Sequence, residues 1–243
     1  LWPTRVLPEG SLRTRLERLA DEHDIAIREM LIWETGNGTL NAAVSGMIPG
    51  LRYVFLTDGL LREMCEDEIE AIYAHELGHV KHGHLILRIL ALLLPMFACM
   101  GLTETIAWIS PFTGQPSELS DSWLEPITLF ATVGYMFFAL GWYARRLEHQ
   151  ADLWACSNLS GTGTATIENH PYFRVLQRLT VQEDPSRAGW LHPSPTSRLR
   201  FLKTATTAPQ AAARFEWQLH MLAVVMLSVA TWAISILLLS RLG

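Results

Sequence analysis

Three long apolar stretches constrain the fold of this 243-residue chain more than any other feature. They cover residues 85–109, 123–143 and 219–239. Each approaches the roughly 20 apolar residues that an α-helix needs to cross about 30 Å of hydrocarbon. We therefore predict three transmembrane helices, the first two of which form a hairpin, and a lipid bilayer as a partner.

The composition agrees with a membrane protein and excludes some partners. Charged residues make up 18% of the chain, against about 25% in soluble proteins. With 19 Lys and Arg against 24 Asp and Glu, the net charge is −5, so a nucleic-acid partner is not expected. Three widely spaced cysteines predict no disulfide framework and a reducing compartment. The composition does not define an oligomeric state.

The first residues of the chain carry neither an initiating Met nor a signal peptide. The sequence opens Leu1-Trp2-Pro3, without a charged start followed by a short apolar run. We therefore expect a piece of a longer protein whose N-terminal part is missing.

Between the start of the chain and the first apolar stretch, the pattern alternates between helix and strand. Residues 11–23 place leucines on one helical face and charges on the other. Three stretches, residues 25–33, 41–48 and 52–57, are rich in alternating or β-branched apolar residues and predict a small antiparallel sheet. Turns such as Pro49-Gly50 separate them. A helical phase starts at Asp58, and a further helix is predicted over residues 66–80.

The strongest chemical signal is His75-Glu76-Leu77-Gly78-His79 in this last helix. Residues four apart share one helical face, so both imidazoles can reach one zinc ion while Glu76 faces the side that holds water. The spacing therefore supplies two ligands and a base. A catalytic zinc site needs a third protein ligand and an open position for water.

The segment after the second apolar stretch can supply the third ligand. Glu148 and Asp152 lie one helical turn apart, which suits a carboxylate ligand and a second carboxylate that orients a ligand imidazole. Three further histidines nearby are predicted to be ordinary polar residues, because filling the open position would gain no catalysis: His82, His84 and His149.

Two residues further along could return to the same site. His192, followed by Pro193, could stabilise a tetrahedral oxyanion, although a single histidine of this kind is more often structural. Arg198 follows in the same proline-broken stretch. By contrast, the Gly- and Thr-rich residues 157–170 are predicted to be a loop.

These motifs resemble the membrane gluzincin peptidases, a family that includes HtpX-like, CAAX prenyl protease-like and Oma-like enzymes. The resemblance covers about residues 11–203 and rests on His-Glu-Leu-Gly-His, Arg-Arg-x-Glu-x-x-x-Asp and His-Pro-x-x-x-x-Arg. The resemblance implies one zinc ion per chain, with His75, His79 and Glu148 as ligands and Glu76 as general base. It also implies that Asp152 supports a ligand, and that His192 and Arg198 act near the oxyanion and near Asp152. The segment Asn41, Ala42, Ala43, Val44, Ser45 and Gly46 also resembles the family's edge strand beside the zinc.

Together these features predict an α+β fold: a mainly helical zincin-type domain with a small antiparallel sheet, fused to transmembrane helices. Residues 1–84 and 144–218 would form the two parts of the peptidase domain. Residues 85–143 would form a transmembrane hairpin, and residues 219–243 a C-terminal transmembrane helix.

The predicted function is a membrane-embedded, zinc-dependent endopeptidase that acts on membrane or misfolded proteins, with the polypeptide substrate added as a strand along residues 41–46. One alternative is a non-catalytic scaffold that binds peptides, but a pure scaffold has no need of Glu76. Another is a channel or transporter; however, Arg88, Glu104 and Glu125 lie near the ends of the apolar stretches, where anchoring explains them.

The distribution of basic residues predicts the orientation in the membrane. No Lys or Arg falls within residues 89–144, and only Arg241 follows the last apolar stretch. The other 18 lie on the side of the zinc motifs. The positive-inside rule then predicts that the catalytic side is cytoplasmic.

Overall fold

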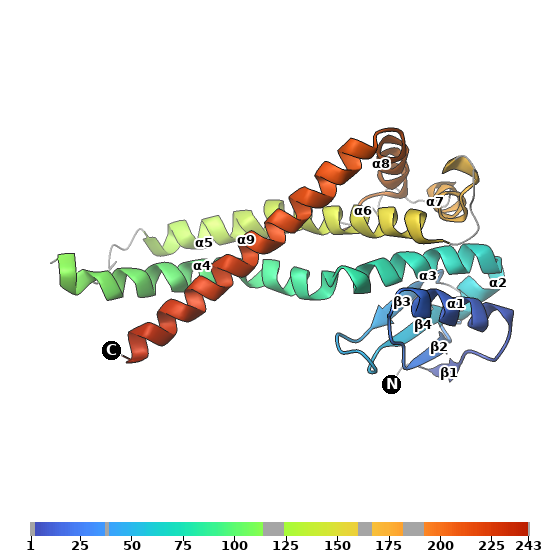
Figure 1. Ribbon diagram of the computed structural model, residues 1–243, viewed down its shortest axis with the longest axis horizontal. Helices are drawn as coiled ribbons and strands as arrows, with labels where there is room; N and C mark the ends of the chain where they lie inside the picture. Colours follow the sequence, from blue (N-terminus) through green and yellow to red (C-terminus); the bar gives the residue numbers. More distant parts are fainter. Residues whose placement is uncertain (1–2, 37–38, 114–123, 160–166, 182–191, 243) are drawn as a thin grey trace. The chain divides into compact units, whose positions relative to one another are not determined.

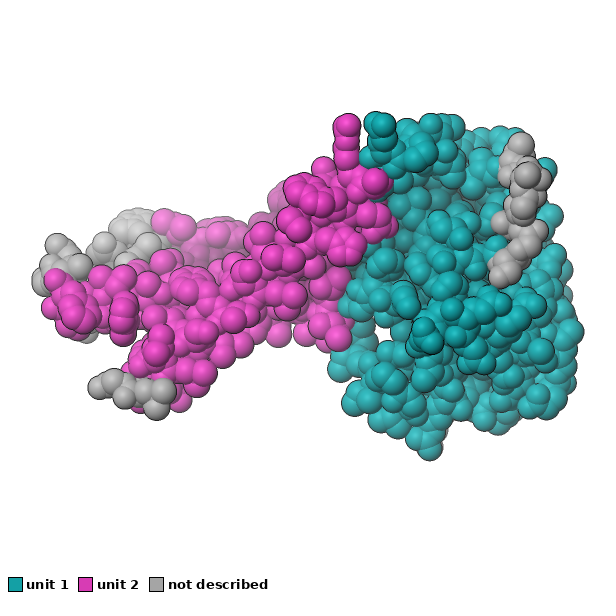
Figure 2. All heavy atoms as spheres, in the orientation of Figure 1, with its two compact units in different colours: residues 1–85, 147–212 teal, residues 86–146, 213–243 magenta. Residues whose placement is uncertain are grey.

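The computed structural model describes residues 3–36, 39–113, 124–159, 167–181 and 192–242 (Figure 1). The chain divides into two compact units (Figure 2): unit 1 holds residues 1–85 and 147–212, and unit 2 holds residues 86–146 and 213–243. Most of the predicted loop between the first two apolar stretches, and residues 160–166 of the predicted Gly-rich loop, lie outside the described residues.

A four-stranded sheet in unit 1 contains the three predicted strands and one more. The strands are β1 (Thr4–Val6), β2 (Glu29–Trp33), β3 (Ala42–Ser45) and β4 (Tyr53–Thr57), in the order β1-β2-β4-β3. The sequence pattern did not reveal β1, because it is only three residues long and none of its residues is buried. Strand β3 pairs with β4 on one side and forms an edge of the sheet.

The sheet is mixed, whereas the sequence predicted antiparallel pairing throughout. Strands β1 and β2, and strands β3 and β4, are antiparallel, but β2 and β4 are parallel. The reason is strand order: β4 inserts between β2 and β3, so two strands that run in the same direction become neighbours. Apolar alternation identifies strands and their buried faces, but it does not set their order.

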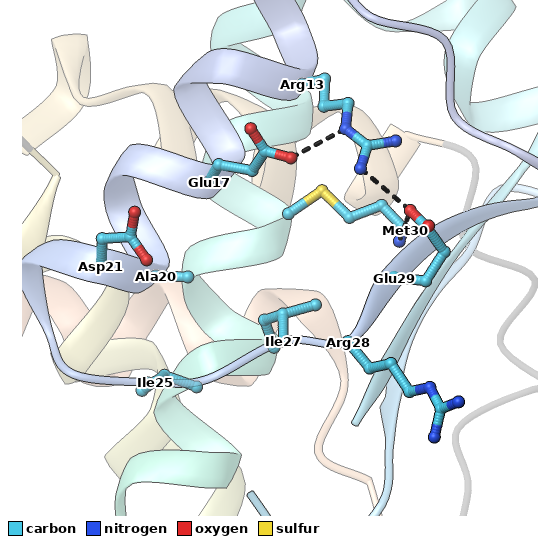
Figure 3. Close-up of a pocket in the computed structure, with 9 residues that line it drawn as sticks. All are labelled: Arg13, Glu17, Ala20, Asp21, Ile25, Ile27, Arg28, Glu29 and Met30. Carbon is cyan, nitrogen blue, oxygen red and sulfur yellow. Dashed lines mark hydrogen bonds and ion pairs between the residues drawn. The ribbon is translucent and has the colours of Figure 1, made fainter. Parts of the chain in front are cut away.

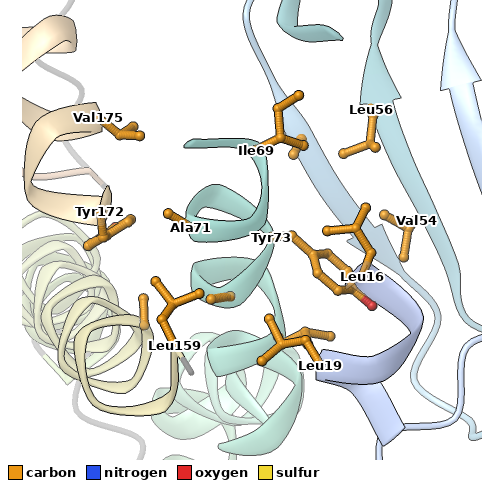
Figure 4. Packing of buried hydrophobic residues seen from close by; sticks show 14 of the residues in the cluster. Leu16, Leu19, Val54, Leu56, Ile69, Ala71, Tyr73, Leu159, Tyr172 and Val175 are labelled. Atoms are coloured by element: carbon orange, nitrogen blue, oxygen red, sulfur yellow. The ribbon is translucent and has the colours of Figure 1, made fainter. Parts of the chain in front are cut away.

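Two helices cover the sheet and share its core (Figure 4). Helix α1 (Ser11–Glu22) packs on α3 (Glu66–Lys81), and α3 also packs on β3. The short helix α2 (Asp58–Glu63) follows β4 directly, and the Thr57 hydroxyl caps it by accepting from the Leu60 N–H. The central side chains of the core come from both helices and from alternating strand positions: Leu16, Leu19, Met30, Ile32, Val54, Leu56, Ile69 and Tyr73.

The sequence specifies the start and the end of α3. Three acidic residues in its first turn, Glu66, Asp67 and Glu68, stabilise the positive end of the helix dipole. After the helix ends, Gly83 adopts a φ of 64°, in the left-handed region that glycine enters without strain. The helix is thereby interrupted, and the next helix begins at His84.

The second segment of unit 1 is more helical than the sequence pattern indicated. Helix α6 (Gly141–Asn158) is followed by the short turn η2 (Ile167–Asn169), by α7 (Pro171–Val181) and by α8 (Pro195–Thr207). The last part of the predicted loop, residues 167–170, thus contains η2, and α7 was not predicted. Helix α7 packs against both α3 and α8. Ser194 caps α8, whose first residue is Pro195.

Unit 2 is built mainly from α4 (His84–Thr113), α5 (Leu124–Tyr135), the π-helical segment η1 (Met136–Leu140) and α9 (Pro209–Leu242). Specific contacts join these helices. The Tyr135 hydroxyl donates to the Ala91 carbonyl at 2.7 Å, and the Ser240 hydroxyl donates to Glu104 at 2.7 Å.

Within the described residues, three helices are long and apolar enough to cross a membrane, as predicted. They cover His84–Phe112, Pro126–Asn158 and Pro209–Arg241. Large apolar side chains along them are exposed, including Phe112, Phe130 and Phe138, which are 75 to 81% accessible. Apolar surface of this extent is typical of contact with lipid.

Candidate metal centre

Helices α3 and α6 bring three potential metal ligands together inside unit 1. His75 and His79 project from one face of α3, and Glu148 projects from α6. One ligand atom from each residue lies within 4.8 Å of the other two. His75 and Glu148 are buried. The structure therefore brings together the three residues that the two sequence motifs predicted as ligands.

The spacing of the three ligand atoms fits one small metal ion. The Nε2 atoms of His75 and His79 are 3.1 Å apart, and they lie 3.6 and 3.7 Å from the Glu148 carboxylate oxygens. Two ligands bound tetrahedrally at about 2.0–2.2 Å from one zinc ion are about 3.3–3.6 Å apart. Two imidazoles and one carboxylate are also a donor set that catalytic zinc sites use.

A close contact between α3 and α6 sets this spacing. A Cβ atom on Gly78 would lie 3.2 Å from the Ala151 Cα and 3.3 Å from the Trp154 Cβ. These distances are shorter than ordinary van der Waals contacts, so glycine lets the two helices approach this closely without a shift in either. The glycine inside the His-Glu-Leu-Gly-His motif therefore positions the carboxylate ligand relative to the two imidazoles.

A buried network of charged and polar groups surrounds the Nδ1 atom of His75. Asp152 Oδ1 lies 3.1 Å from this nitrogen, and the Tyr172 hydroxyl lies 2.8 Å from it. The Tyr172 hydroxyl also donates to Asp152 at 2.6 Å, and the Arg198 guanidinium hydrogen-bonds both groups. We call these three residues, Asp152, Tyr172 and Arg198, the charged network. They come from α6, α7 and α8.

The charged network shifts the pKa of the groups within it. Burial and the positive charge of Arg198 lower the pKa of His75, but the hydrogen bonds and charges of Asp152 and Glu148 outweigh them and raise it to about 9. Burial, together with the charge of Asp152, raises the pKa of Tyr172 well above its ordinary value. Tyr172 therefore stays a hydroxyl that can donate to Asp152.

Glu76 lies between the two histidines on α3 and faces strand β3. Burial raises the pKa of its carboxyl group, and a hydrogen bond with the Val44 backbone acts in the opposite direction. A carboxylate whose pKa is raised towards neutrality is better suited to accept a proton near pH 7. The contact also places the candidate base next to the edge strand that the sequence singled out.

The structure also places the two predicted downstream residues. Nδ1 of His192 lies 3.3 Å from the Glu148 carboxylate, and its side chain is 63% exposed. This imidazole therefore lies at the open side of the ligand cluster. Arg198 lies against Asp152, with its Nε 3.1 Å from both carboxylate oxygens.

Three side chains around the cluster were not predicted from the sequence. Tyr172 and Gln150 carried no motif, and His84 was expected to be an ordinary polar residue. In the structure His84 and Gln150 are both buried, and Nδ1 of His84 lies 2.7 Å from Nδ1 of His79. The position of Gln150 between Glu148 and Asp152 was an available signal, whereas Tyr172 could be found only once α7 was known to pack on α3.

A separate pocket of about 240 Å³ lies between α1 and the start of β2 (Figure 3). Arg13 lines this pocket and makes ion pairs with Glu17 at 2.8 Å and Glu29 at 3.0 Å. None of the residues that line this pocket belongs to the ligand cluster. The pocket and the candidate metal centre are therefore distinct features of unit 1.

Known proteins are similar to this chain in sequence and in fold. A CAAX prenyl protease 1 homolog from Oryza sativa subsp. japonica is 36% identical over 98 residues, which are 39% of this chain and 23% of that protein. Protease HtpX from Yersinia enterocolitica is 24% identical over 192 residues, 74% of this chain and 62% of that protein. The chain thus spans less than two thirds of the length of these relatives.

The crystal structure of Ste24p from S. mikatae matches 83% of this chain and 51% of that chain, with a TM-score of 0.60 and 22% identity. This likeness confirms the predicted fold, a mainly helical domain with a small sheet joined to membrane helices. The sequence model of peptidase family M48 matches residues 7–206, so the resemblance drawn from the motifs is confirmed. The chain belongs to peptidase family M48.

Proposed function

We propose that this chain is the catalytic part of a zinc-dependent endopeptidase of the membrane. The observation that carries the proposal is the cluster of His75, His79 and Glu148, whose spacing matches one zinc ion and whose neighbour Glu76 lies beside an edge strand. Membership of a peptidase family and three apolar helices support it.

The proposed roles follow from the contacts of each side chain. His75, His79 and Glu148 would hold one zinc ion, which would act as a Lewis acid and lower the pKa of water at the site. Glu76 would accept the proton of the attacking water and pass it to the leaving amine. Asp152 and Arg198 would hold His75 in its binding orientation. His192, at the open side of the cluster, would stabilise the developing oxyanion.

The substrate is proposed to be an extended segment of a membrane or misfolded protein that pairs with β3. Strand β3 lies at one edge of the sheet, where an extended peptide can pair with its backbone, and the backbone of Val44 in this strand is hydrogen-bonded to Glu76. Pairing along the segment from Asn41 to Gly46 would therefore deliver a peptide bond to the candidate base.

The test of the proposed function combines metal content with hydrolysis. Purified protein should hold close to one zinc per chain and cleave casein, and chelation should abolish the cleavage. Glu76→Gln should keep zinc and fold but lose hydrolysis, because an amide cannot accept the proton of water. Glu148→Gln should lose zinc, because only two of the three protein ligands remain.

The outcomes separate the proposal from its rival. Wild-type hydrolysis by the Glu76→Gln variant, or full zinc occupancy in the Glu148→Gln variant, contradicts the proposed mechanism. Peptide binding without any cleavage by the wild-type protein favours a zincin-fold scaffold instead.

We also propose a division of the chain and an orientation in the membrane. Residues 1–84 and 144–218 would form the peptidase domain on the cytoplasmic side, residues 85–143 the hairpin and residues 219–243 the last membrane helix. In a variant without native cysteines, a cysteine at position 117 should react with an impermeant maleimide added outside intact cells, and one at position 186 should not. The reverse pattern would place the catalytic side outside. Both labelling positions lie outside the described residues.

A further inference from the structure

A second chain of hydrogen-bonding groups ends at the other histidine of the cluster, His79. Its Nδ1 lies 2.7 Å from Nδ1 of His84, and Nε2 of His84 lies 3.0 Å from Oε1 of Gln150. The side chains of His84 and Gln150 are buried, with 1 and 3% of their surface exposed. Gln150 lies on α6, two residues after Glu148. All of these groups belong to unit 1.

The break between α3 and α4 makes this contact possible. Residues five apart on one continuous helix point about 140° away from each other, so the two rings could not meet. Here α3 ends at Lys81, Gly83 takes a left-handed backbone conformation, and α4 begins at His84. Two backbone hydrogen bonds, from His82 to Gly78 and from Gly83 to Val80, close the turn. The ring of His84 is thereby directed back onto His79.

We propose that His84 and Gln150 are positioning residues that fix the tautomer and the orientation of His79 for metal binding. This inference rests on the proposed function, in which Nε2 of His79 binds the zinc ion. A neutral imidazole that uses the lone pair of Nε2 for a metal carries its proton on Nδ1. That proton is donated to Nδ1 of His84, which must then carry its own proton on Nε2.

The amide oxygen of Gln150 sets the direction of this chain. A carbonyl oxygen only accepts hydrogen bonds, so it selects the form of His84 that is protonated on Nε2. Nδ1 of His84 then accepts, and His79 must be protonated on Nδ1. If a donor took the place of the amide oxygen, the order would reverse and the proton of His79 would move to Nε2, the atom needed for zinc. We call His84 and Gln150 the neutral relay.

The test measures the zinc affinity of the 243-residue chain in detergent, by competition with a colorimetric zinc chelator. Gln150→Met removes the acceptor at nearly constant volume and should weaken zinc binding by about 10–100-fold, the usual effect of losing a partner of a ligand histidine. Gln150→Glu keeps an oxygen acceptor and should stay within about threefold of the wild type. Gln177→Met, at an exposed position of α7, is the matched control and should change nothing.

Two further measurements separate a positioning role from a structural one. Thermal melting of the metal-free protein shows whether the Gln150→Met variant folds. If that variant does not fold, the His84→Phe variant, which keeps a ring but has no ring nitrogen, is measured in its place. In zinc-loaded protein labelled with ¹⁵N-histidine, His84 should give the signature of the form protonated on Nε2.

The outcomes are separable. If Gln150→Met and Gln150→Glu bind zinc equally well, or if His84 carries its proton on Nδ1, the neutral relay is refuted. If His79→Ala leaves zinc affinity unchanged, the proposed function itself fails. A loss of zinc affinity in His79→Ala, together with wild-type affinity in His84→Phe and Gln150→Met, refutes only the inference.

Discussion

The two histidines of the cluster lie 4.7 Å apart, ring to ring, yet their surroundings differ in kind. Nδ1 of His75 faces the charged network, in which a fully buried carboxylate is hydrogen-bonded by a guanidinium and a phenol. Nδ1 of His79 faces the neutral relay, which ends on an amide. The same residue type, one helical turn apart, is thus held in two different ways.

The two environments should contribute differently to protein stability and to zinc affinity. Removing one member of a buried charge pair leaves an uncompensated charge, which costs far more than losing one neutral hydrogen bond. The charged network should therefore matter for folding as well as for His75. The neutral relay should matter mainly for where the proton of His79 lies.

The largest effect is expected for Asp152→Ala. It leaves Arg198, whose side chain is only 15% exposed, without its fully buried partner, which should cost about 3–5 kcal/mol, or roughly 6–20 °C in melting temperature for a chain of this size. Thermal unfolding of the metal-free protein, followed by circular dichroism in detergent, measures this. The double variant Asp152→Ala/Arg198→Met should recover part of the loss. If Asp152→Ala is no less stable than Gln150→Met, the distinction between the two sides is wrong.

A substitution that affects both histidines equally comes next. Gly78→Val places carbon atoms where the backbone of Ala151 and the Cβ of Trp154 lie 3.2 to 3.3 Å away, so α3 and α6 must separate. Overpacking of this kind costs about 1–3 kcal/mol. Because Glu148 then moves away from both imidazoles, zinc affinity should also fall. The Gly78→Ala variant should have a zinc affinity between those of the wild type and Gly78→Val. Unchanged zinc affinity in Gly78→Val would contradict the close packing.

A smaller effect is expected for Tyr172→Phe, which removes one hydroxyl from the charged network and leaves its two ions paired. The lost hydrogen bond to Asp152 should reduce stability by about 1–2 kcal/mol. Tyr53→Phe, at a partly exposed position of strand β4, is the control and should be neutral. A Tyr172→Phe variant as unstable as Asp152→Ala would mean that the phenol, and not the ion pair, holds the network together.

The smallest effect is expected where an ion pair is partly exposed. Glu68 and Arg178 lie 2.6 Å apart, and the arginine side chain is 45% exposed. Burial raises the pKa of Glu68, but hydrogen bonds from Arg178 and the Cys65 backbone outweigh it and lower the pKa below 4.5. Arg178→Met should therefore cost less than about 1 kcal/mol at pH 7.

The pH dependence of this last effect follows from its sign. A lowered pKa in the folded state gives stability that is present above the unfolded value and is lost as the pH falls through the folded value. The melting temperatures of the wild type and of Arg178→Met should thus converge as the pH falls below about 4.5. A difference that grows in acid would refute the assignment.

Local patterns in the sequence predicted much of this arrangement. Helical spacing alone indicates that His75 and His79 share a face, and that Glu148 and Asp152 lie one turn apart. The acidic first turn of α3 and the apolar lengths of the membrane helices are also local features. In each case the information lies within about 25 consecutive residues, where helix periodicity and solvation determine the outcome.

What could not be predicted depends on contacts between distant segments. Tyr172 reaches His75 only because α7 packs on α3, and the parallel pairing of β2 and β4 depends on strand order. His84 looked like an unremarkable neighbour of the motif, because its contact with His79 depends on the backbone conformation of Gly83. A single left-handed residue is not visible as a periodic pattern.

The interrupted course of unit 1 has a consequence for timing during synthesis. The unit is made of residues 1–85 and 147–212, so Glu148 follows His79 by 69 positions (148 − 79). At about 5–20 residues per second, a ribosome needs roughly 3 to 14 seconds to make this stretch. During that interval the two imidazoles exist without their carboxylate partner. The proposed peptidase therefore stays inert until the intervening apolar hairpin has been translated, and a nascent chain that stalls inside the hairpin carries no complete metal site.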